Sequence, residues 1–258
     1  MKSVYKGSEK VAEFESYDEL RVGDGKPAFI YEGNALVYPN PVKDGLVLWY
    51  DFSGRTNADG QRGIAEDLSG NGNHGTLQNF GYTAESGYVG DGLKFDGVDD
   101  FVPVTSTSSM LSTKFTWTAT ITPIIEETGN DTMFMYGNST AAYFRIQLGR
   151  LGAAMRGIDS PVDYTHTSFR IETGVTYYVC LVYDNGSYYI YANGEQVGES
   201  HSSLKDIEYT LSWIGRYTGA SPRSFNGDFH SVTVYNRPLT PEEIAHNYAI
   251  EKERFGIE

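Results

Sequence analysis

Two Asn-Gly pairs, each set between runs of aromatic and β-branched residues, constrain the fold of this chain more than any other feature. Both occur in the stretch TYYVCLVYDNGSYYIYANGEQV, residues 176–197. Asn-Gly is a preferred centre of a two-residue β-hairpin turn, because both positions accept a left-handed backbone. The stretch therefore predicts a three-stranded antiparallel meander over residues 176–199.

Strand-like runs of the same kind fill the chain from Gly45 onward, and before its last twenty residues no pattern of helical length interrupts them. In FTWTATITPI (115–124), apolar residues alternate with threonines, which predicts a strand with its apolar face buried and its threonine face in solvent. Ten or more such runs at hairpin spacing predict an all-β fold, a two-sheet antiparallel sandwich or jelly roll. We assign Trp49 and Trp117 to its core.

The end of the chain predicts one helix. Thr240 is a suitable N-cap, Pro241 suits the first helical position, and Glu243 completes a capping box three residues after the cap. The apolar stripe expected to dock on the sheets consists of Ile244, Tyr248, Ile250 and Glu251.

Residues 1–41 are predicted to form a short β-rich segment, distinct from a domain of residues 42–258. The runs SVYKG, KVAEF and PAFIYEGNALVYPN are typical of short strands, and a Gly-Asn turn within residues 32–34 joins two of them. Pro39 and Pro41 interrupt any strand and mark the boundary. A few short strands bury little surface, so we expect this segment to pack on the main domain or to join a neighbouring chain by strand addition.

The formal net charge of −14, without any run of Lys or Arg, disfavours attraction to nucleic acid or to anionic lipid. No stretch approaches the roughly 18 apolar residues of a membrane-spanning helix, and the opening KSVYKGSEK lacks the apolar core of a signal peptide. We therefore expect a protein made in the cytoplasm, without membrane insertion and without a nucleic acid partner. Cys180 is the single cysteine, which excludes an intrachain disulfide, and it is expected to be a buried hydrophobe.

Six blocks of the sequence occur in a characteristic order: GLVLWYDFSG, DLSGNGNHGTL, GLKFDGVDDFVPV, TYYVCLVYDNGSYYIYANGEQV, YTLSWIGRY and FHSVTVYNRPLTPEEI. Together, over residues 42–255, they resemble the laminin-G-like branch of the concanavalin A-like lectin/glucanase superfamily. The resemblance implies a curved jelly roll of two antiparallel sheets. The segments YEGNALVYPNPVKDGLVLWYDFSG and YNRPLTPEEIAHNYAIEKERFGI further resemble virion proteins, often tail-associated, of phages and prophages of Gram-positive hosts.

Members of this superfamily that hydrolyse glycans have closely spaced carboxylates on one strand, in the pattern Glu-x-Asp-x-x-Glu, and this sequence has no such pattern. The acidic stretch IEETGND (125–131) contains Gly-Asn and predicts a solvated turn. The five His residues form no short-spaced metal pair, and no Gly-x-Ser-x-Gly elbow is present. We therefore expect a protein that is not an enzyme.

The string DLSGNGNHG (67–75) has three interpretations: a metal loop, a ligand-binding loop or a tight corner between strands. In many laminin-G-like modules, the Asp of such a string and an Asp in the closing strand hold Ca²⁺, which takes about six to eight oxygen ligands. Asp67 matches the first position, but the closing strand has His230 in the second, and imidazole is a poor calcium ligand. We expect a structural corner and no cofactor, with Asp67 as the candidate ligand if calcium binds.

Glycan binding requires aromatic rings that stack on sugar faces and polar groups that orient hydroxyls. The candidates are Tyr136, Tyr143, Arg145, Arg156, Tyr164, Trp213, Arg216, Tyr217 and Arg223. Each of them singly is also typical of core packing or of a polar rim.

Together with these features, the resemblance to phage and prophage virion proteins implies a non-catalytic virion protein of a phage or phage-derived particle, with a lectin-like domain that contacts host-surface glycans. Weak sites repeated around a homo-oligomer gain apparent affinity through effective concentration. The expected partners are other virion proteins and a host-surface glycan, and residues 1–41 are the candidate segment for attachment or oligomerisation. Two alternatives stay open: a passive capsid or tail decoration without a ligand, and a glycan-degrading depolymerase.

Overall fold

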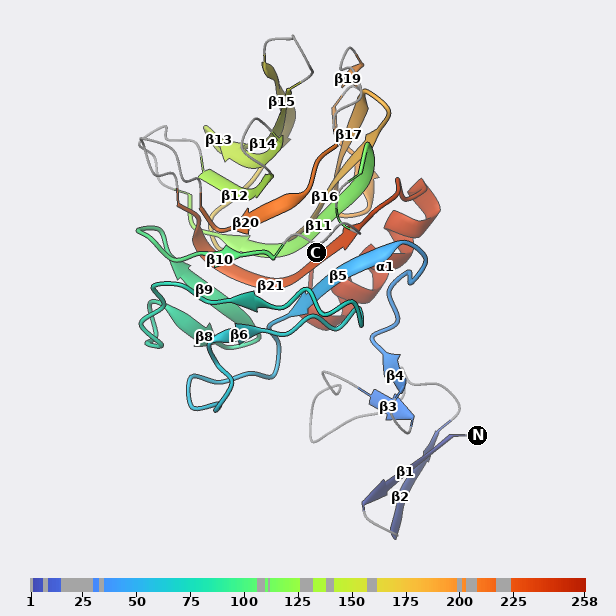
Figure 1. Ribbon diagram of the computed structural model, residues 1–258. Coiled ribbons are helices and arrows are strands. Elements are labelled where there is room, and N and C mark those ends of the chain that lie inside the picture. The colour runs from blue at the N-terminus through green and yellow to red at the C-terminus, as the bar shows by residue number, and fades with distance from the viewer. Residues whose placement is uncertain are drawn as a thin grey trace. The chain divides into compact units, whose positions relative to one another are not determined.

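The computed structural model describes residues 2–6, 9–14, 30–32, 35–105, 110, 112–125, 132–137, 142–156, 162–198, 201–202, 208–216 and 224–258. The chain divides into two units, residues 1–41 and 42–258. In the first unit, the described residues form two antiparallel pairs (Figure 1): β1 (Lys2–Lys6) with β2 (Glu9–Phe14), and β3 (Ile30–Glu32) with β4 (Ala35–Tyr38). The β3–β4 pair confirms the hairpin predicted around the Gly-Asn turn.

The second unit is a sandwich of two antiparallel sheets with one described helix, α1 (Pro241–Phe255), which confirms the predicted fold class. The six-stranded sheet has the order β10 (Val102–Pro103), β20 (Leu211–Ile214), β12 (Thr132–Gly137), β13 (Ala142–Gln147), β14 (Arg150–Arg156) and β15 (Val162–Arg170). The nine-stranded sheet has the order β18 (Glu195–Gln196), β17 (Ser187–Ala192), β16 (Tyr177–Asp184), β11 (Lys114–Pro123), β21 (Asn226–Tyr235), β9 (Gly92–Asp96) and β8 (Gly87–Val89). In addition, β5 (Leu46–Asp51) pairs with β21, β19 (His201–Ser202) pairs with β17, and β6 (Ile64–Ala65) pairs with β7 (Gly75–Thr76).

The predicted meander is present as strands β16, β17 and β18. Its turns contain Asn185 and Asn193 at φ values of 45° and 49°, the left-handed backbone that Asn-Gly turns require. Trp49 and Trp117 are each 1% exposed, and Cys180 is buried, as predicted. Trp117 lies between the two sheets, where its ring stacks on Phe115 with 4.6 Å between centroids.

The threonine face of β11 differs from the prediction, because it is buried instead of facing solvent. Thr116, Thr118 and Thr120 are each at most 2% exposed. The C-terminal segment covers this face: the Thr116 hydroxyl donates to the Arg237 carbonyl, and the Thr120 hydroxyl donates to Glu251 of α1. The outer face of the nine-stranded sheet therefore forms a polar interface with the C-terminal segment. The threonine hydroxyls of β11 are the hydrogen-bond donors for the buried carbonyl and carboxylate of that segment.

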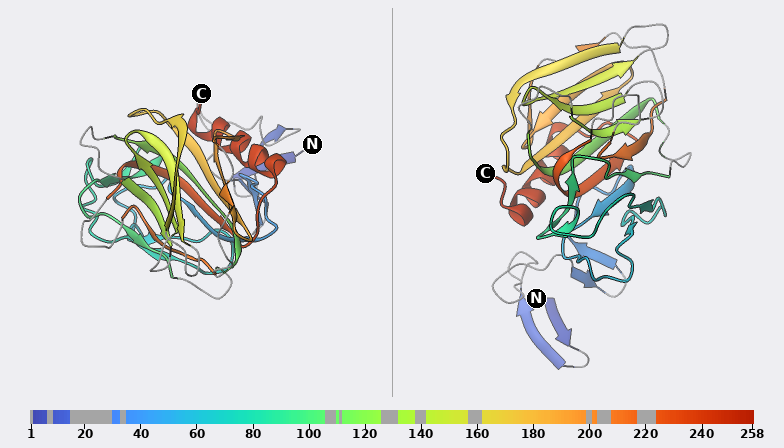
Figure 2. Two further views of the ribbon diagram at one scale, coloured as in Figure 1. Left: turned by 90° about the horizontal axis from the view of Figure 1, so that it is seen from above. Right: turned by 90° about the vertical axis from the view of Figure 1, so that its left-hand side faces the viewer.

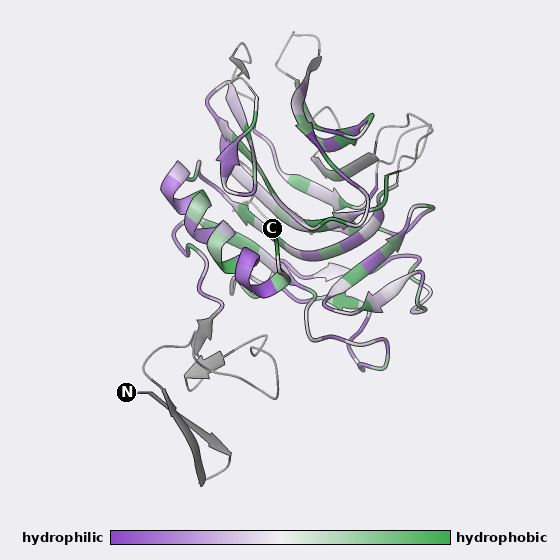
Figure 3. Cartoon of the chain, turned by 180° about the vertical axis from the view of Figure 1, so that it is seen from behind, coloured by the Kyte–Doolittle hydropathy of each residue, from purple (hydrophilic) through white to green (hydrophobic). Residues whose placement is uncertain are grey.

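The helix begins as predicted. The Thr240 side chain accepts from the Glu243 backbone N–H, and the Glu243 carboxylate accepts from the Thr240 N–H, which completes the capping box. The buried residues of the helix are Ile244, Asn247 and Glu251, so the expected stripe is partly wrong: Tyr248 and Ile250 are only partly buried. Figure 3 shows hydrophilic and hydrophobic residues mixed along α1.

A buried ionic network fixes the last turns of the helix to the sheet. The Arg254 side chain is 4% exposed and pairs with Asp51 of β5 at 2.6 Å and with Glu251 at 3.0 Å. Burial raises the pKa of Asp51, and the Arg254 guanidinium opposes that shift.

Figure 2 shows the helix and the two sheets from two further directions. Among the described residues, no helix is both long enough and apolar enough to cross a membrane.

Candidate functional site

Three aromatic side chains form a row across β20, β12 and β13. Tyr136 pairs in register with Trp213 on one side and with Tyr143 on the other. Its ring centroid lies 5.3 Å from that of Trp213 and 5.0 Å from that of Tyr143. The preceding register row, which contains Met135 and Phe144, belongs to the core, so this aromatic row occupies the opposite, outer face of the six-stranded sheet.

The two ends of the aromatic row are more accessible than its middle. Tyr136 is 5% exposed, whereas Tyr143 and Trp213 are partly exposed. The rings of Tyr136 and Tyr143 stack with an interplanar angle of 19°, so each covers one face of the other. A sugar ring that stacks on this row would therefore contact Tyr143 or Trp213.

The next outward-facing register row, two residues further along β13, contains Arg145 of β13, Gly152 of β14 and His166 of β15. Arg145 is 2% exposed, and its Nη2 lies 2.8 Å from Nε2 of His166. Because a guanidinium can only donate, Nε2 of His166 is the acceptor in this hydrogen bond. A Cβ atom at position 152 would lie 2.4 Å from the Thr165 carbonyl oxygen, so glycine is required beneath this bond. Arg145 therefore positions neighbouring side chains more than it presents charge to solvent.

The structure places the other predicted ligand-binding residues as follows. Arg156 and Tyr164 lie in β14 and β15, and position 164 pairs with Ala154 in the same register row as Tyr143. The Arg216 guanidinium lies 5.5 Å from the ring centroid of Phe101, next to the end of β20. The side chains of Arg156 and Tyr164, and the whole of Tyr217 and Arg223, lie outside the described part of the chain. Ligand binding by all eight residues and by Arg223 stays a prediction.

The string DLSGNGNHG folds as a corner fastened to β5. Asp67 is 6% exposed. Its Oδ1 accepts hydrogen bonds from the backbone N–H groups of Trp49 and Ser69, at 2.9 and 3.0 Å, and its Oδ2 accepts one from the N–H of Asn73 at 2.9 Å. Three backbone donors therefore converge on one carboxylate and satisfy both of its oxygens.

The remaining polar residues of the corner also bind backbone groups. The side-chain amides of Asn71 and Asn73 donate to the carbonyls of Leu46 and Val47, at 3.1 and 2.6 Å. His74 accepts from the Asp67 N–H through Nδ1 at 3.0 Å. The corner interpretation thus accounts for the polar side chains of the string apart from Oδ1 of Asn73, which is buried without a hydrogen-bond partner among the described residues. The assignment of Asp67 as a calcium ligand stays a prediction.

The closing strand has His230 where the resemblance would place the second calcium ligand. Its Nδ1 lies 2.9 Å from the Asp91 carbonyl oxygen, and its Nε2 lies 2.7 Å from Oγ1 of Thr122. A carbonyl only accepts, so Nδ1 is the protonated nitrogen and, in the neutral ring, the Thr122 hydroxyl donates to Nε2. The imidazole thus connects β21 and β11 to the turn between β8 and β9.

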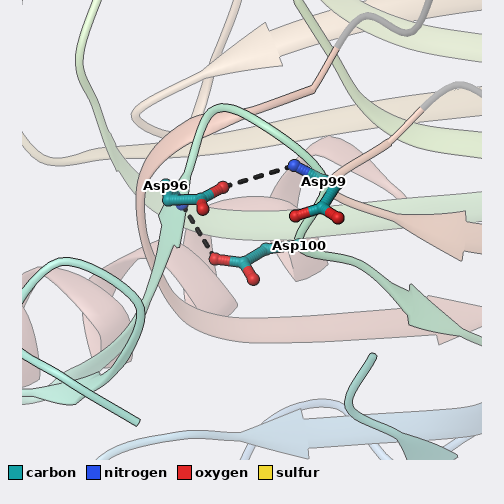
Figure 4. A group of neighbouring side chains, drawn as sticks. All are labelled: Asp96, Asp99 and Asp100. Carbon is teal, nitrogen blue, oxygen red and sulfur yellow. Dashed lines mark hydrogen bonds between the residues drawn. The ribbon is translucent and has the colours of Figure 1, made fainter. Parts of the chain in front are cut away.

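A second acidic group, which the sequence analysis did not single out, lies at the end of β9 and in the loop that leads to β10 (Figure 4). Asp96, Asp99 and Asp100 each offer a carboxylate oxygen, and these oxygens lie within 4.8 Å of one another. Oδ1 of Asp96 accepts from the N–H of Val98 at 2.7 Å, and Oδ2 of Asp100 accepts from the N–H of Asp96 at 2.9 Å. Burial raises the pKa of Asp100 to about 6. Carboxylates at this spacing suit a hard cation, while the hydrogen bonds also make the loop a self-contained turn.

A small pocket lies beside the corner, away from the aromatic row. Its volume is about 230 Å³, and it is lined by Arg55, Gln61, Ile64, Glu66 and His74. The Arg55 guanidinium donates to the carbonyls of Ile64 and Gln61 at 2.8 Å each, so its main role is to shape this loop.

The sequence matches the family described as the Concanavalin A-like lectin/glucanases superfamily over residues 96–245. This span covers more than half of the chain. The chain belongs to this superfamily. All strands of the six-stranded sheet lie within the matched span, so the aromatic row is part of the superfamily domain. A comparison with curated proteins found no match.

Solved structures with the same fold come from proteins of different kinds. A Trypanosoma rangeli sialidase in complex with 2,3-difluorosialic acid matches at a TM-score of 0.60 and 17% identity, covering 81% of this chain and 33% of the sialidase. The binding domain of Paraclostridial Mosquitocidal Protein 1 matches at 0.56 and 16%, with coverages of 80% and 52%. An HCR/D mutant matches at 0.62 and 12%, with coverages of 82% and 54%. The chain thus spans a third to about half of these proteins, and identities this low show the fold alone.

Proposed function

We propose that this chain is a non-catalytic virion protein of a phage or phage-derived particle, and that its jelly-roll unit binds glycans on the host surface. The observation that supports glycan binding is the aromatic row, because rings from the consecutive strands β12 and β13 and from β20, which is distant in sequence, meet on one outer face. Aromatic side chains with partly exposed faces are the usual platforms for sugar rings. The mosquitocidal protein domain of the same fold is described as a binding domain, which agrees with this role.

The assignment as a non-catalytic protein is supported by the charges of the same sheet. Within the strand residues described for the six-stranded sheet, Asp163 is the single acidic residue. Glycoside hydrolysis requires two carboxylates at a defined separation across the scissile bond. A depolymerase would therefore need to place its acids elsewhere on the molecule.

The assignment to a virion is supported by the resemblance of the leading and closing segments to phage and prophage virion proteins. In such a particle many copies present the same face, so individually weak sites act together. Residues 1–41 form their own unit and are the proposed segment for attachment or oligomerisation. Deleting them is expected to abolish incorporation into particles while the thermal unfolding of the jelly roll stays unchanged; normal incorporation would overturn this assignment.

The proposed function is tested by binding of the purified chain to intact Gram-positive cells and to their purified wall glycans. We expect saturable binding that free glycan competes, without release of reducing ends. The variant Tyr143→Ala should weaken this binding about tenfold, because stacking of a ring on an aromatic side chain contributes on the order of 1 kcal/mol or more. The matched control is Tyr189→Ala, a partly exposed tyrosine of the nine-stranded sheet, which should leave binding unchanged.

Two other outcomes favour the alternatives. Absence of binding, together with weaker particles when the protein is removed, would indicate a passive decoration. Release of reducing ends from the glycan would indicate a depolymerase.

A further inference from the structure

The six-stranded sheet differs in charge from the chain as a whole. The formal net charge of the chain is −14. The described strands of this sheet nevertheless contain Arg145, Arg150, Arg156 and Arg170 against Asp163 as the one acidic residue. An overall acidic protein therefore has a locally cationic sheet, and the aromatic row lies on that sheet.

Two of these arginines lie directly opposite each other. Arg150 of β14 pairs in register with Arg170 of β15, and Gln147 of β13 completes the row. Gln147 follows Ile146, a core residue, so the row faces outward, like the aromatic row. Arg150 is partly exposed and Arg170 is exposed.

The Arg150–Arg170 pair has no described counter-charge. Nη1 of Arg150 donates to the Ser168 carbonyl at 3.3 Å, which satisfies one donor but neutralises no charge. No described carboxylate lies within 4.0 Å of either guanidinium, including that of Glu172, the next acidic residue along the chain. Like charges directly opposite each other destabilise a sheet. An anion between the two side chains would remove that cost and use their remaining donors.

The cationic pair and the aromatic row lie at two levels of the same strands. Along β13, Tyr143 and Gln147 are four residues apart, which corresponds to about 13 Å at the rise of a β-strand. One extended chain of sugars can therefore reach both the exposed ring of Tyr143 and the two guanidinium groups.

We propose that Arg150 and Arg170 bind the oxyanion of an acidic polysaccharide whose sugar rings contact the aromatic row. This inference rests on the proposed glycan-binding function and adds the class of glycan. Guanidinium groups bind planar carboxylates, sulfates and phosphates through paired hydrogen bonds, and they stay charged at any physiological pH. Recognition then has two parts, in which the rings of Tyr143 and Trp213 contact the sugars and the arginine pair selects for negative charge.

The test measures binding of the purified full chain to five polymers: polygalacturonate, dextran sulfate, poly(glycerol phosphate), neutral dextran and the host wall glycan. The test variant is Arg150→Gln with Arg170→Gln. The control is Arg62→Gln with Lys252→Gln, which changes the net charge equally at exposed positions outside the six-stranded sheet. We expect the test variant to bind the preferred acidic polymer at least about tenfold more weakly, because charge-assisted hydrogen bonds are lost. The control should stay within about twofold of the unmodified chain.

The outcomes separate this inference from the proposed function. If both double variants lose the same affinity for the acidic polymer, the binding is general electrostatic attraction and the inference is overturned. Binding of neutral dextran or wall glycan that Tyr143→Ala weakens and the arginine double variant does not would overturn the inference while the proposed function stands. Absence of binding to any of the five polymers would overturn both. The carboxylate, sulfate and phosphate polymers identify which oxyanion is preferred.

Discussion

Removing the Asp67 carboxylate tests whether the DLSGNGNHG string is a structural corner. In Asp67→Ala, the backbone N–H groups of Trp49, Ser69 and Asn73 all lose their acceptor. The bonds from Trp49 and Asn73 are buried, so no solvent replaces the lost acceptor without disturbing the corner. Each buried donor left unsatisfied costs about 1–3 kcal/mol.

The expected loss in the free energy of unfolding is about 3–5 kcal/mol, with the two buried bonds contributing most of it. In a domain of about 200 residues, each kcal/mol lowers Tm by about 2–4 °C, so Tm should fall by about 10 °C. The Tm of Asp67→Asn should lie between those of the unmodified chain and of Asp67→Ala. Its side-chain amide keeps one acceptor oxygen but places an NH₂ donor against the remaining backbone N–H groups.

The assay is thermal unfolding followed by circular dichroism, with calcium and with a chelator. The control is Asp91→Ala, which removes an exposed carboxylate. The backbone carbonyl of residue 91 still accepts from His230, so the free energy of unfolding should change by less than about 0.5 kcal/mol. A Tm loss below about 2 °C in Asp67→Ala would refute the corner argument. A chelator effect on the unmodified chain as large as that of Asp67→Ala would instead assign the carboxylate to a metal.

Two further predictions concern buried charges. Arg254→Met leaves the Asp51 and Glu251 carboxylates without their partner, which should cost about 3–5 kcal/mol and lower the urea midpoint; a change under 1 kcal/mol would contradict the role of this network. Burial raises the pKa of Asp100 to about 6 from 3.8, so the folded state keeps this proton to higher pH than the unfolded chain, and stability is lost as pH rises through that range. The variant Asp100→Asn, which cannot ionise, should therefore lose less Tm than the unmodified chain between pH 4 and pH 7, and equal losses would contradict this assignment.

Local signals in the sequence were sufficient for the elements that depend on neighbouring residues. Asn-Gly turns define the β16–β17–β18 meander, because a left-handed backbone is needed wherever two strands reverse within two residues. The capping box at Thr240 defines the start of α1, and it is also a local signal, because both of its hydrogen bonds join residues within four positions of the sequence.

Features that depend on distant segments could not be predicted in this way. The threonine face of β11 alternates like any half-exposed strand, and only the docking of the C-terminal segment, more than a hundred residues later, buries it. The expected helix stripe failed partly for the same reason: Asn247 is buried because it donates to the Tyr235 hydroxyl and accepts from the Val42 N–H. Hydrophobic periodicity does not report such polar contacts.

The candidate site was predictable as residue types but not as a geometry. Tyr136, Tyr143 and Trp213 were predicted from the chemistry of their side chains. Their alignment in one row depends on the register of β20, β12 and β13, which the sequence does not show. The Arg150–Arg170 pair was missed, because residues twenty positions apart become neighbours only when the β14–β15 register is known. The stretch DGVDD (96–100) contains three acidic residues, but the sequence does not show that their carboxylates converge.

Tryptophan fluorescence during glycan titration tests the central claim most directly. The chain has three tryptophans, and Trp49 and Trp117 are each 1% exposed, so Trp213 is the one whose surroundings a ligand on the aromatic row would change. We predict a saturable change in emission on addition of host wall glycan, abolished by Trp213→Phe and retained in Tyr189→Ala. Glycan binding without any change in emission, or the same change in Trp213→Phe, would contradict the assignment of the aromatic row as the binding face.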